Sequence, residues 1–353
     1  GQRTMATAAR RGVREEAVRG LLRWMLGAAA VMAVTASAQA ETVTVWLSKL
    51  FGAAAIPIGL ERGYFAAEGI DVKMVYFDSA QPIAVGVASG NVDFGISGMS
   101  ASFYTLAAQG HLRLLGTSSS EAPSFHALAY LASNASYDAG LKTAKDLPGH
   151  TIAITQVGTG LHYAIGLASE KYGFPMSAVT VRPLQSNSNV IAALAGNTID
   201  AAVLPSGPAI ATTQAGKAKL IGWVSDVGVE WTTGSAIFTS TKTADGSGNM
   251  VKRFLVAYRH GMNDMHNAFA GPGGKRQDGP DQPAVLAIIA HFTGLAPDEI
   301  LRGVAYSVRD GRISAADVDR EIDWFRSQNL LKGDVSAKAL IDSRYALPLT
   351  TLD

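Results

Sequence analysis

Residues Gly86–Ala101 read Gly-Val-Ala-Ser-Gly-Asn-Val-Asp-Phe-Gly-Ile-Ser-Gly-Met-Ser-Ala, and this stretch decides the fold. A similar stretch begins at Ala193 and reads Ala-Leu-Ala-Gly-Asn-Thr-Ile-Asp-Ala-Ala-Val-Leu-Pro-Ser-Gly. Aligned without gaps, Asp93 falls on Asp200. Each copy predicts a helix ending at a residue that tolerates left-handed φ, then a short buried strand, then small residues that begin a new helix. The repetition predicts two similar α/β lobes.

Strands and helices alternate on both sides of the two copies, which is typical of mostly parallel sheets. Strands are expected at Thr42–Leu47, Val92–Ser97, Leu112–Thr117, Ala127–Leu131, Thr151–Thr155, Val179–Val181, Ile199–Leu204, Leu220–Val224 and Ser235–Ser240, with a further one ending at Val75. Helices are expected at Ala53–Ala67, Ser100–Gln109, Leu161–Tyr172, Asn187–Ala195, Pro208–Ala215, Met250–Phe269, Ala284–Phe292, Pro297–Val304 and Ala315–Gln328. The pattern predicts an α/β fold with two mostly parallel sheets, helices on both faces and a ligand cleft between two lobes.

The N-terminus has the pattern of an export signal. Arginines from Arg10 onward precede an apolar run at Leu21–Val34, and Ala38-Gln39-Ala40 matches an A-x-A cleavage site. We therefore expect a signal peptide at 1–40, cleavage after Ala40 and a periplasmic mature chain. A membrane anchor is the alternative, but the apolar run is short for a span of about 20 residues.

Composition excludes several classes of function. The chain has 353 residues and a formal net charge of +1, and no basic run follows the N-terminus, which argues against a nucleic-acid partner. It has no cysteine, so a disulfide framework, thiolate metal sites and cysteine nucleophiles are excluded. His260 and Asp264 share a helix face, but a metal site needs more ligands than these two. We expect neither a metal nor a cofactor.

Four stretches resemble a known family. They are Gly63–Val72 (Gly-Tyr-Phe-Ala-Ala-Glu-Gly-Ile-Asp-Val), Ser89–Gly95, Asp146–Ala153 and Asp323–Leu331. Together with the exported start, they are similar to the substrate-binding proteins of ABC importers for nitrate, sulfonates, taurine and thiamine-pyrimidine precursors. The resemblance runs over nearly all of Glu41–Tyr345.

The resemblance implies a type II periplasmic-binding-protein fold with two chain crossings between lobes. Lobe 1 would comprise 41–130 and 235–353, the latter with the C-terminal helices, and lobe 2 would comprise 131–234. Such a protein is expected to be a monomer that binds a small molecule and delivers it to an ABC permease in the inner membrane. Two positions depart from the family: Asn197 replaces the usual glycine, and Pro205-Ser206-Gly207-Pro208 replaces a Trp-Glu-Pro motif in the expected cleft.

Candidate ligand contacts follow the strand ends, because ligands of open α/β sheets bind there and at helix N-termini. For each, an ordinary cap, turn or core residue is the alternative. The candidates are Ser48, Lys49, Phe51, Gly98, Met99, Ser100, Ser118, Ser119, Thr159, Gly160, Leu161, His162, Asn187, Ser188, Pro205, Ser206 and Trp231. Asp93 and Asp200 stand at strand starts, away from the cleft, and are expected to be structural.

The expected ligand is a small anionic organic solute. Neutral donors and helix N-termini would hold the anion, with Lys49 the main exception, and neighbours such as Phe51, Leu161 and Trp231 would hold an organic tail or ring. A sulfonate, a taurine-like solute or an aromatic carboxylate is therefore preferred over nitrate. The alternatives are a signalling receptor and an enzyme of the thiamine-pyrimidine or menaquinone-precursor synthase type, although no nucleophile–base pair with recognisable spacing is present.

Overall fold

The computed structural model describes residues 38–227, 231 and 234–352. The predicted signal peptide therefore lies outside the described residues except for its last three. From Glu41 onward, the described residues form one compact unit.

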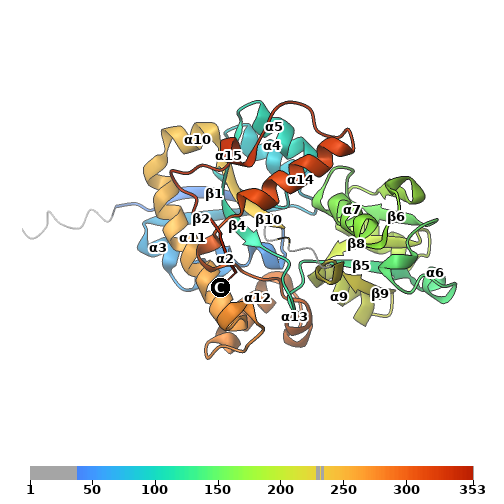
Figure 1. The fold of residues 1–353 in the computed structure, drawn as a ribbon. Coiled ribbons are helices and arrows are strands. Elements are labelled where there is room, and N and C mark those ends of the chain that lie inside the picture. Colours follow the sequence, from blue (N-terminus) through green and yellow to red (C-terminus); the bar gives the residue numbers. More distant parts are fainter. Residues whose placement is uncertain (1–37, 228–230, 232–233, 353) are drawn as a thin grey trace, which may run out of the picture. The chain divides into compact units, whose positions relative to one another are not determined.

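Two five-stranded sheets organise this unit (Figure 1). The first has the order β2-β1-β3-β10-β4, and the second has the order β7-β6-β8-β5-β9. The first contains β1 (Glu41–Leu47), β2 (Ile70–Tyr76), β3 (Phe94–Ser97), β4 (Leu112–Ser119) and β10 (Ser235–Ser240). The second contains β5 (Leu128–Ser133), β6 (Thr151–Ile154), β7 (Thr180–Pro183), β8 (Ala201–Pro205) and β9 (Ala218–Trp223). These two sheets form the predicted α/β fold.

Each sheet is mixed, and the reversed strand is the one that arrives from the other sheet. β10 runs antiparallel to β3 and β4, and β5 runs antiparallel to β8 and β9. The other neighbours, β1 with β2 and β3 and β6 with β7 and β8, pair in parallel. The strands β3 and β8 are short apolar runs that lie at the centre, as expected for strands covered on both faces.

Helices cover the sheets, and we call the first sheet with α2–α5 and α10–α15 lobe 1 and the second sheet with α6–α9 lobe 2. Lobe 1 has α2 (Ala55–Glu61), α3 (Tyr64–Ala67), α4 (Gln81–Ala88), α5 (Ala101–Ala108), α10 (Thr241–Gly246), α11 (Gly248–Phe269), α12 (Gln282–Thr293), α13 (Pro297–Gly303), α14 (Ala315–Ser327) and α15 (Ala337–Leu340). Lobe 2 has α6 (Asn134–Asp138), α7 (Gly160–Tyr172), α8 (Asn187–Ala195) and α9 (Ser206–Gln214).

Two sequence expectations need correction. The single helix expected at Ala53–Ala67 is divided into the 3-10 helix η1 (Phe51–Ala53), α2 and α3, because Gly63 adopts φ +74° and ends the helical path there. The strand expected at Ala127–Leu131 was assigned to lobe 1, whereas β5 pairs with β8 and β9 of the second sheet. The first crossing between sheets therefore precedes β5.

A buried glutamate joins the two crossings. The carboxyl of Glu121 accepts a hydrogen bond from Leu128 N (2.8 Å) at the start of β5, and Glu121 N donates to Trp231 O (3.0 Å) on the returning segment. Burial raises the pKa of Glu121 to about 8, because removal from water disfavours the charged form and outweighs the hydrogen bonds from backbone N–H groups. The carboxyl is thus part of the junction between the lobes.

Among the described residues, no single helix is both long and apolar enough to span a membrane. Only α12 and α13 taken together meet that requirement, and a bend of 98° separates them.

Candidate functional site

A pocket lies between the two sheets, at the carboxyl ends of β1, β3, β6 and β8. It contains about 930 Å³ of space between atoms, part of which is open to solvent. Lobe 1 and the crossings contribute Ser48, Leu50, Phe51, Gly52, Ala53, Ser79, Ala80, Ile96, Ser97, Gly98, Ser119, Trp231, Gly234, Ser235 and Ala305. The segment around β5 and the rest of lobe 2 contribute Ala127, Leu128, Thr155, Thr159, Gly160, Leu161, Asn187, Pro205, Ser206 and Gly207.

Eleven of the seventeen residues chosen from the sequence line this pocket. They are Ser48, Phe51, Gly98, Ser119, Thr159, Gly160, Leu161, Asn187, Pro205, Ser206 and Trp231. The structure brings them together from both lobes, as the rule for strand ends predicts. Their contact with a ligand stays a prediction.

The other six chosen residues, which are Lys49, Met99, Ser100, Ser118, His162 and Ser188, lie outside the pocket lining. Met99 is a core residue with 1% exposure, and Ser100 caps α5 by accepting a hydrogen bond from Phe103 N (3.0 Å). Lys49 is exposed, and its Nζ lies 4.5 Å from the centre of the Tyr76 ring. The structure therefore places the expected cation against an aromatic ring at the surface rather than in the pocket.

His162 shapes the loop before α7. Its Nδ1 accepts a hydrogen bond from Gly158 N (3.0 Å), and its ring meets Trp324 edge to face at 5.1 Å. Burial lowers the pKa of His162 to about 4, so the ring is neutral at pH 7. The ring is neutral and its Nδ1 already accepts a hydrogen bond. These features favour the alternative that His162 packs the helix over the hypothesis that a charged His162 binds the ligand.

The start of α7 presents backbone donors to the pocket. Thr159 is the N-cap, and its side chain accepts from His162 N (3.4 Å), while Gly160 and Leu161 in the first turn line the cavity. First-turn N–H groups have no partner within the helix and lie at the positive end of the helix dipole. This site can hold an anionic or neutral acceptor group.

Hydroxyl groups gather at the lobe 1 side of the pocket. Ser118 and Ser119 at the end of β4 both contact Ser235 Oγ at the start of β10, the Ser119 hydroxyl at 3.3 Å. A Cβ on Gly52 would lie 3.0 Å from the hydroxyl oxygens of Ser119 and Ser235. Ser118 itself is buried behind the lining and orients Ser235. A side chain at position 52 would therefore crowd these two hydroxyl groups.

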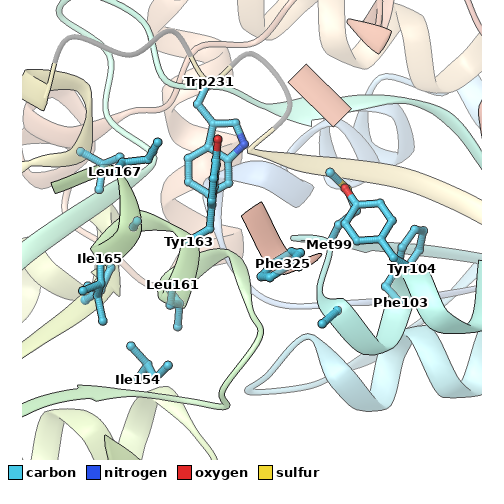
Figure 2. Packing of buried hydrophobic residues seen from close by; sticks show 14 of the residues in the cluster. Met99, Phe103, Tyr104, Ile154, Leu161, Tyr163, Ile165, Leu167, Trp231 and Phe325 are labelled. Carbon is cyan, nitrogen blue, oxygen red and sulfur yellow. The ribbon is translucent and has the colours of Figure 1, made fainter. Parts of the chain in front are cut away.

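Trp231 forms an aromatic wall between the lobes. It is 2% exposed, and its ring meets Tyr163 edge to face at 5.0 Å (Figure 2). A Cβ on Gly160 would lie 3.2 Å from the indole, so the glycine allows α7 to approach the ring closely. The stacking hypothesis for Trp231 is thus compatible with its position, although the side chain is already almost fully buried.

The pocket has no charged side chain among the described residues that line it. Sequence reasoning missed several lining residues, chiefly Gly52, Ser79, Ser97, Gly234 and Ser235. Ser235 begins the strand that returns to the first sheet. Its place at this crossing between the lobes could have identified it from the sequence as a candidate pocket residue. Among the described residues, no group of three or more His, Cys, Asp or Glu side chains is placed to hold a metal ion.

The two lobes also touch beside the pocket. Ser100 and Thr159 form an antiparallel bridge, and Ala101 N donates to Gly158 O (2.7 Å). Asp78, which follows β2, accepts hydrogen bonds from Ser188 N (3.1 Å) and Ser188 Oγ (2.6 Å) at the start of α8. The predicted contact residue Ser188 therefore joins the lobes.

Comparison with known proteins agrees with this architecture. The model of the family described as NMT1/THI5 like matches residues 52–268, and the chain belongs to that family. No curated protein sequence matches the chain.

Solved structures share the fold at low identity. The alkanesulfonate-binding protein SsuA from Xanthomonas axonopodis pv. citri, bound to MOPS, is 21% identical with a TM-score of 0.69, and the match covers 87% of this chain and 99% of that one. The periplasmic nitrate-binding protein NrtA from Synechocystis PCC 6803 is 14% identical with a TM-score of 0.68, covering 84% of each chain. The desulfurization enzyme DSZB is 16% identical with a TM-score of 0.58, covering 87% and 96%. The fold is thus that of periplasmic binding proteins, and an enzyme also uses it.

Proposed function

We propose that this protein is the periplasmic solute-binding component of an ABC importer, which captures a small anionic organic solute by lobe closure and delivers it to a membrane permease. The observation that carries the proposal is the pocket between the sheets, to which both lobes contribute hydroxyl, amide and apolar groups. Such a site is completed only when the lobes meet, which is the basis of ligand-driven domain closure. The family and the fold of the similar structures support the same reading.

The lining favours an organic anion held by neutral donors. An anion without a cationic partner needs several hydrogen bonds, and the first turn of α7 with the Ser119–Ser235 hydroxyls offers them. Phe51, Leu161 and Trp231 provide apolar surface for a tail or ring. We therefore propose a sulfonate, a taurine-like solute or an aromatic carboxylate as the ligand, in preference to bare nitrate.

The proposal includes the organisation of the chain. Residues 1–40 would direct export and be removed, and the mature monomer would act in the periplasm. Lobe 1 would be assembled from segments before and after lobe 2, so that two crossings form the hinge. The boundary expected near residue 130 moves to the segment before β5, because that strand belongs to the second sheet.

Thermal unfolding of Glu41–Asp353 with a panel of solutes tests the function. The panel contains aliphatic and aromatic sulfonates, taurine, aromatic carboxylates, nitrate, bicarbonate and pyrimidines. A solute at about 100 times its Kd should stabilise the protein by about 2.7 kcal/mol. We expect stabilisation by one class of organic anion.

The variant Gly52→Val should abolish that stabilisation, because the added side chain would occupy the pocket floor near Ser119 and Ser235. Gly246→Val is the matched control, since no atom lies within 4 Å of a Cβ at Gly246. Stabilisation by inorganic ions alone would contradict the organic-anion proposal. Failure of every solute to stabilise the protein would contradict the anion-binding function as a whole.

An enzymatic function is the second candidate, because DSZB has the same fold. A serine–histidine hydrogen bond does occur, between Ser225 Oγ and His126 Nδ1 (2.8 Å), but neither residue lines the pocket and the His126 ring is stacked on Trp223. Product formation from a solute that stabilises the protein would favour the enzyme. Neighbouring permease and ATPase genes would favour transport over signalling.

A further inference from the structure

Two buried polar atoms behind the pocket lack a full hydrogen bond. They are Nε1 of Trp231, whose ring lines the pocket, and Oε2 of Glu321 on α14. The other carboxyl oxygen of Glu321 accepts a hydrogen bond from the hydroxyl of Tyr104 on α5 (3.1 Å). Glu321 is 1% exposed, and a buried carboxyl group normally has all its polar atoms paired.

The indole and the carboxyl group lie next to each other. The Trp231 N–H lies close enough to the Glu321 carboxyl group to favour its ionised form. The geometry of this contact falls short of a complete hydrogen bond. Figure 2 shows the indole nitrogen on the side of Trp231 where Phe325 and Tyr104 lie. Phe325 and Glu321 are both buried residues of α14, so this helix faces the back of the pocket wall.

Helix α14 has a central position. It packs against α5 of lobe 1 and against α7 of lobe 2 (Figure 1). Gly166 of α7 allows this approach, since a Cβ there would lie 2.3 Å from the ring of Trp324. A side chain of α14 that holds Trp231 therefore connects the pocket wall with both lobes.

We propose that Glu321 is a positioning residue of the ligand pocket, whose carboxyl group holds the indole of Trp231 in place as the aromatic wall. Tyr104 fixes the carboxyl group from lobe 1, and the ring of Tyr163 on α7 meets the indole edge to face. The proposal rests on the proposed function only in taking the pocket as the ligand site. Ligand contact with Trp231 would be transmitted to α14 through this carboxyl group.

The charges around Glu321 give the proposal a measurable signature. The pKa of Glu321 is raised to about 8, because burial, with a smaller contribution from nearby Asp317, outweighs the bonds from Tyr104 and Trp231 that lower it. Arg320 on the same helix is paired with Asp317, and Tyr163 is the titratable group facing from α7. Glu321 is therefore expected to change from neutral to ionised at mildly alkaline pH, directly beside the Trp231 N–H.

Nuclear magnetic resonance of the indole N–H groups tests the contact without any ligand. The mature chain has four tryptophans, at 46, 223, 231 and 324, and Trp231→Phe identifies the signal of Trp231. With ¹⁵N-labelled tryptophan, this signal should shift with a midpoint near pH 8 in the wild type. The shift should be absent in Glu321→Gln and retained in the control Asp323→Asn, which removes an exposed carboxylate of the same helix.

Tyr104→Phe gives an independent readout if Glu321→Gln fails to fold. Loss of the Tyr104 hydroxyl removes a bond that favours the ionised carboxyl group, so the midpoint should move to higher pH. A Trp231 signal that does not titrate in the wild type, or titrates equally in Glu321→Gln, would overturn the proposal. Because no solute is involved, a negative solute panel would leave this result standing and would count only against the proposed function.

Discussion

The two lobes contain the same hydrogen-bonded pair with different surroundings. In lobe 1, the Asp93 carboxylate accepts from Thr44 N (2.8 Å) and Thr44 Oγ1 (3.1 Å), and in lobe 2 the Asp200 carboxylate accepts from Thr151 N (2.9 Å) and Thr151 Oγ1 (3.0 Å). The two residues of each pair are 49 positions apart. The pair joins β1 to the start of β3 in lobe 1 and β6 to the start of β8 in lobe 2.

In the described part of the chain, the carboxylate of Asp200 has further partners that are not found for the carboxylate of Asp93. Asp200 also accepts from Ser136 Oγ on α6 (2.9 Å) and lies 3.4 Å from His150. The shared bonds belong to the repeated unit, whereas the added ones come from segments specific to lobe 2. The aspartate–threonine bonds are therefore a feature of the repeated fold unit, and the bond to Ser136 is a feature of lobe 2 alone.

Removing each aspartate should give the largest difference between the lobes. Asp200→Ala loses three side-chain bonds and should lower the free energy of unfolding by about 3 kcal/mol, and Asp93→Ala loses two and should lower it by about 2 kcal/mol. Urea unfolding of Glu41–Asp353 measures both. Asp138→Ala, at an exposed position of α6, is the control and should have little effect. Equal losses at Asp93 and Asp200 would contradict a role for Ser136.

Lowering the pH should reveal the contribution of Asp200 to the stability of the protein. Partial burial acts to raise the pKa of Asp200, but bonds from Thr151 and Ser136 and the charge of His150 outweigh it and hold the pKa below its usual value. A lowered folded-state pKa stabilises the protein fully above the ordinary aspartate range, and this stability is lost as the pH falls through the folded value.

The stability attributable to Asp200 should be lost as the pH falls through and below the ordinary aspartate range, and solvent screening keeps this loss small because the side chain is partly exposed. Urea midpoints across this range should fall less steeply in Ser136→Ala and least steeply in Asp200→Asn. A wild-type slope that persists unchanged in Asp200→Asn would show that other groups account for it.

Asp78 connects the lobes asymmetrically. It accepts two hydrogen bonds from Ser188 in the first turn of α8 of lobe 2, while α4, which follows Asp78 in lobe 1, has no side-chain cap at Ala80. Asp78→Ala should weaken the contact between the lobes by about 1 kcal/mol, because one charged hydrogen-bonding group is lost at the surface.

The absence of native cysteine allows spin labels at Asp71→Cys and Lys171→Cys, which are exposed on different lobes. We expect a broader and longer distance distribution in Asp78→Ala than in the parent or in Asp138→Ala. An unchanged distribution would mean that the other contacts, at Ser100 and Thr159, hold the lobes together without Asp78.

The repeated stretches made the architecture predictable. The apolar strands β3 and β8, the glycine and asparagine before them and the aspartates at their starts are local features, so their sequence pattern determines them. The location of the cleft followed from the same pattern, and most of the pocket candidates came from strand ends.

The remaining features depend on contacts between distant segments. Met99 was chosen by position, but the orientation of its side chain into the core depends on packing that a local pattern does not encode. Ser235 and Gly52 become pocket neighbours only because β10 returns to lobe 1 beside β4. Glu321 lies on an amphipathic helix whose partners, Tyr104 and Trp231, are both distant in sequence.

Gly90 before β3 and Asn197 before β8 occupy equivalent positions, so that substituting the residue of one lobe into the other should give the smallest effect on stability. Gly90 has φ +80° and Asn197 has φ +54°, and Asn197 Oδ1 also accepts from Ala135 N (3.0 Å). Asn197→Gly keeps the left-handed backbone but loses this bond, and it should lower the free energy of unfolding by about 0.5 kcal/mol. Asn197→Ala should lower the free energy of unfolding by about 1 kcal/mol. It loses the bond to Ala135, and alanine, unlike asparagine, has no polar side chain that favours the left-handed region.

In lobe 1, Gly90→Asn should lower the free energy of unfolding by no more than about 0.5 kcal/mol, because the new side chain meets only the flexible Lys242 at 3.1 Å. Urea unfolding of the three variants measures these effects, and an Asn197→Gly variant more stable than the wild type would show that the bond to Ala135 does not explain the departure from glycine.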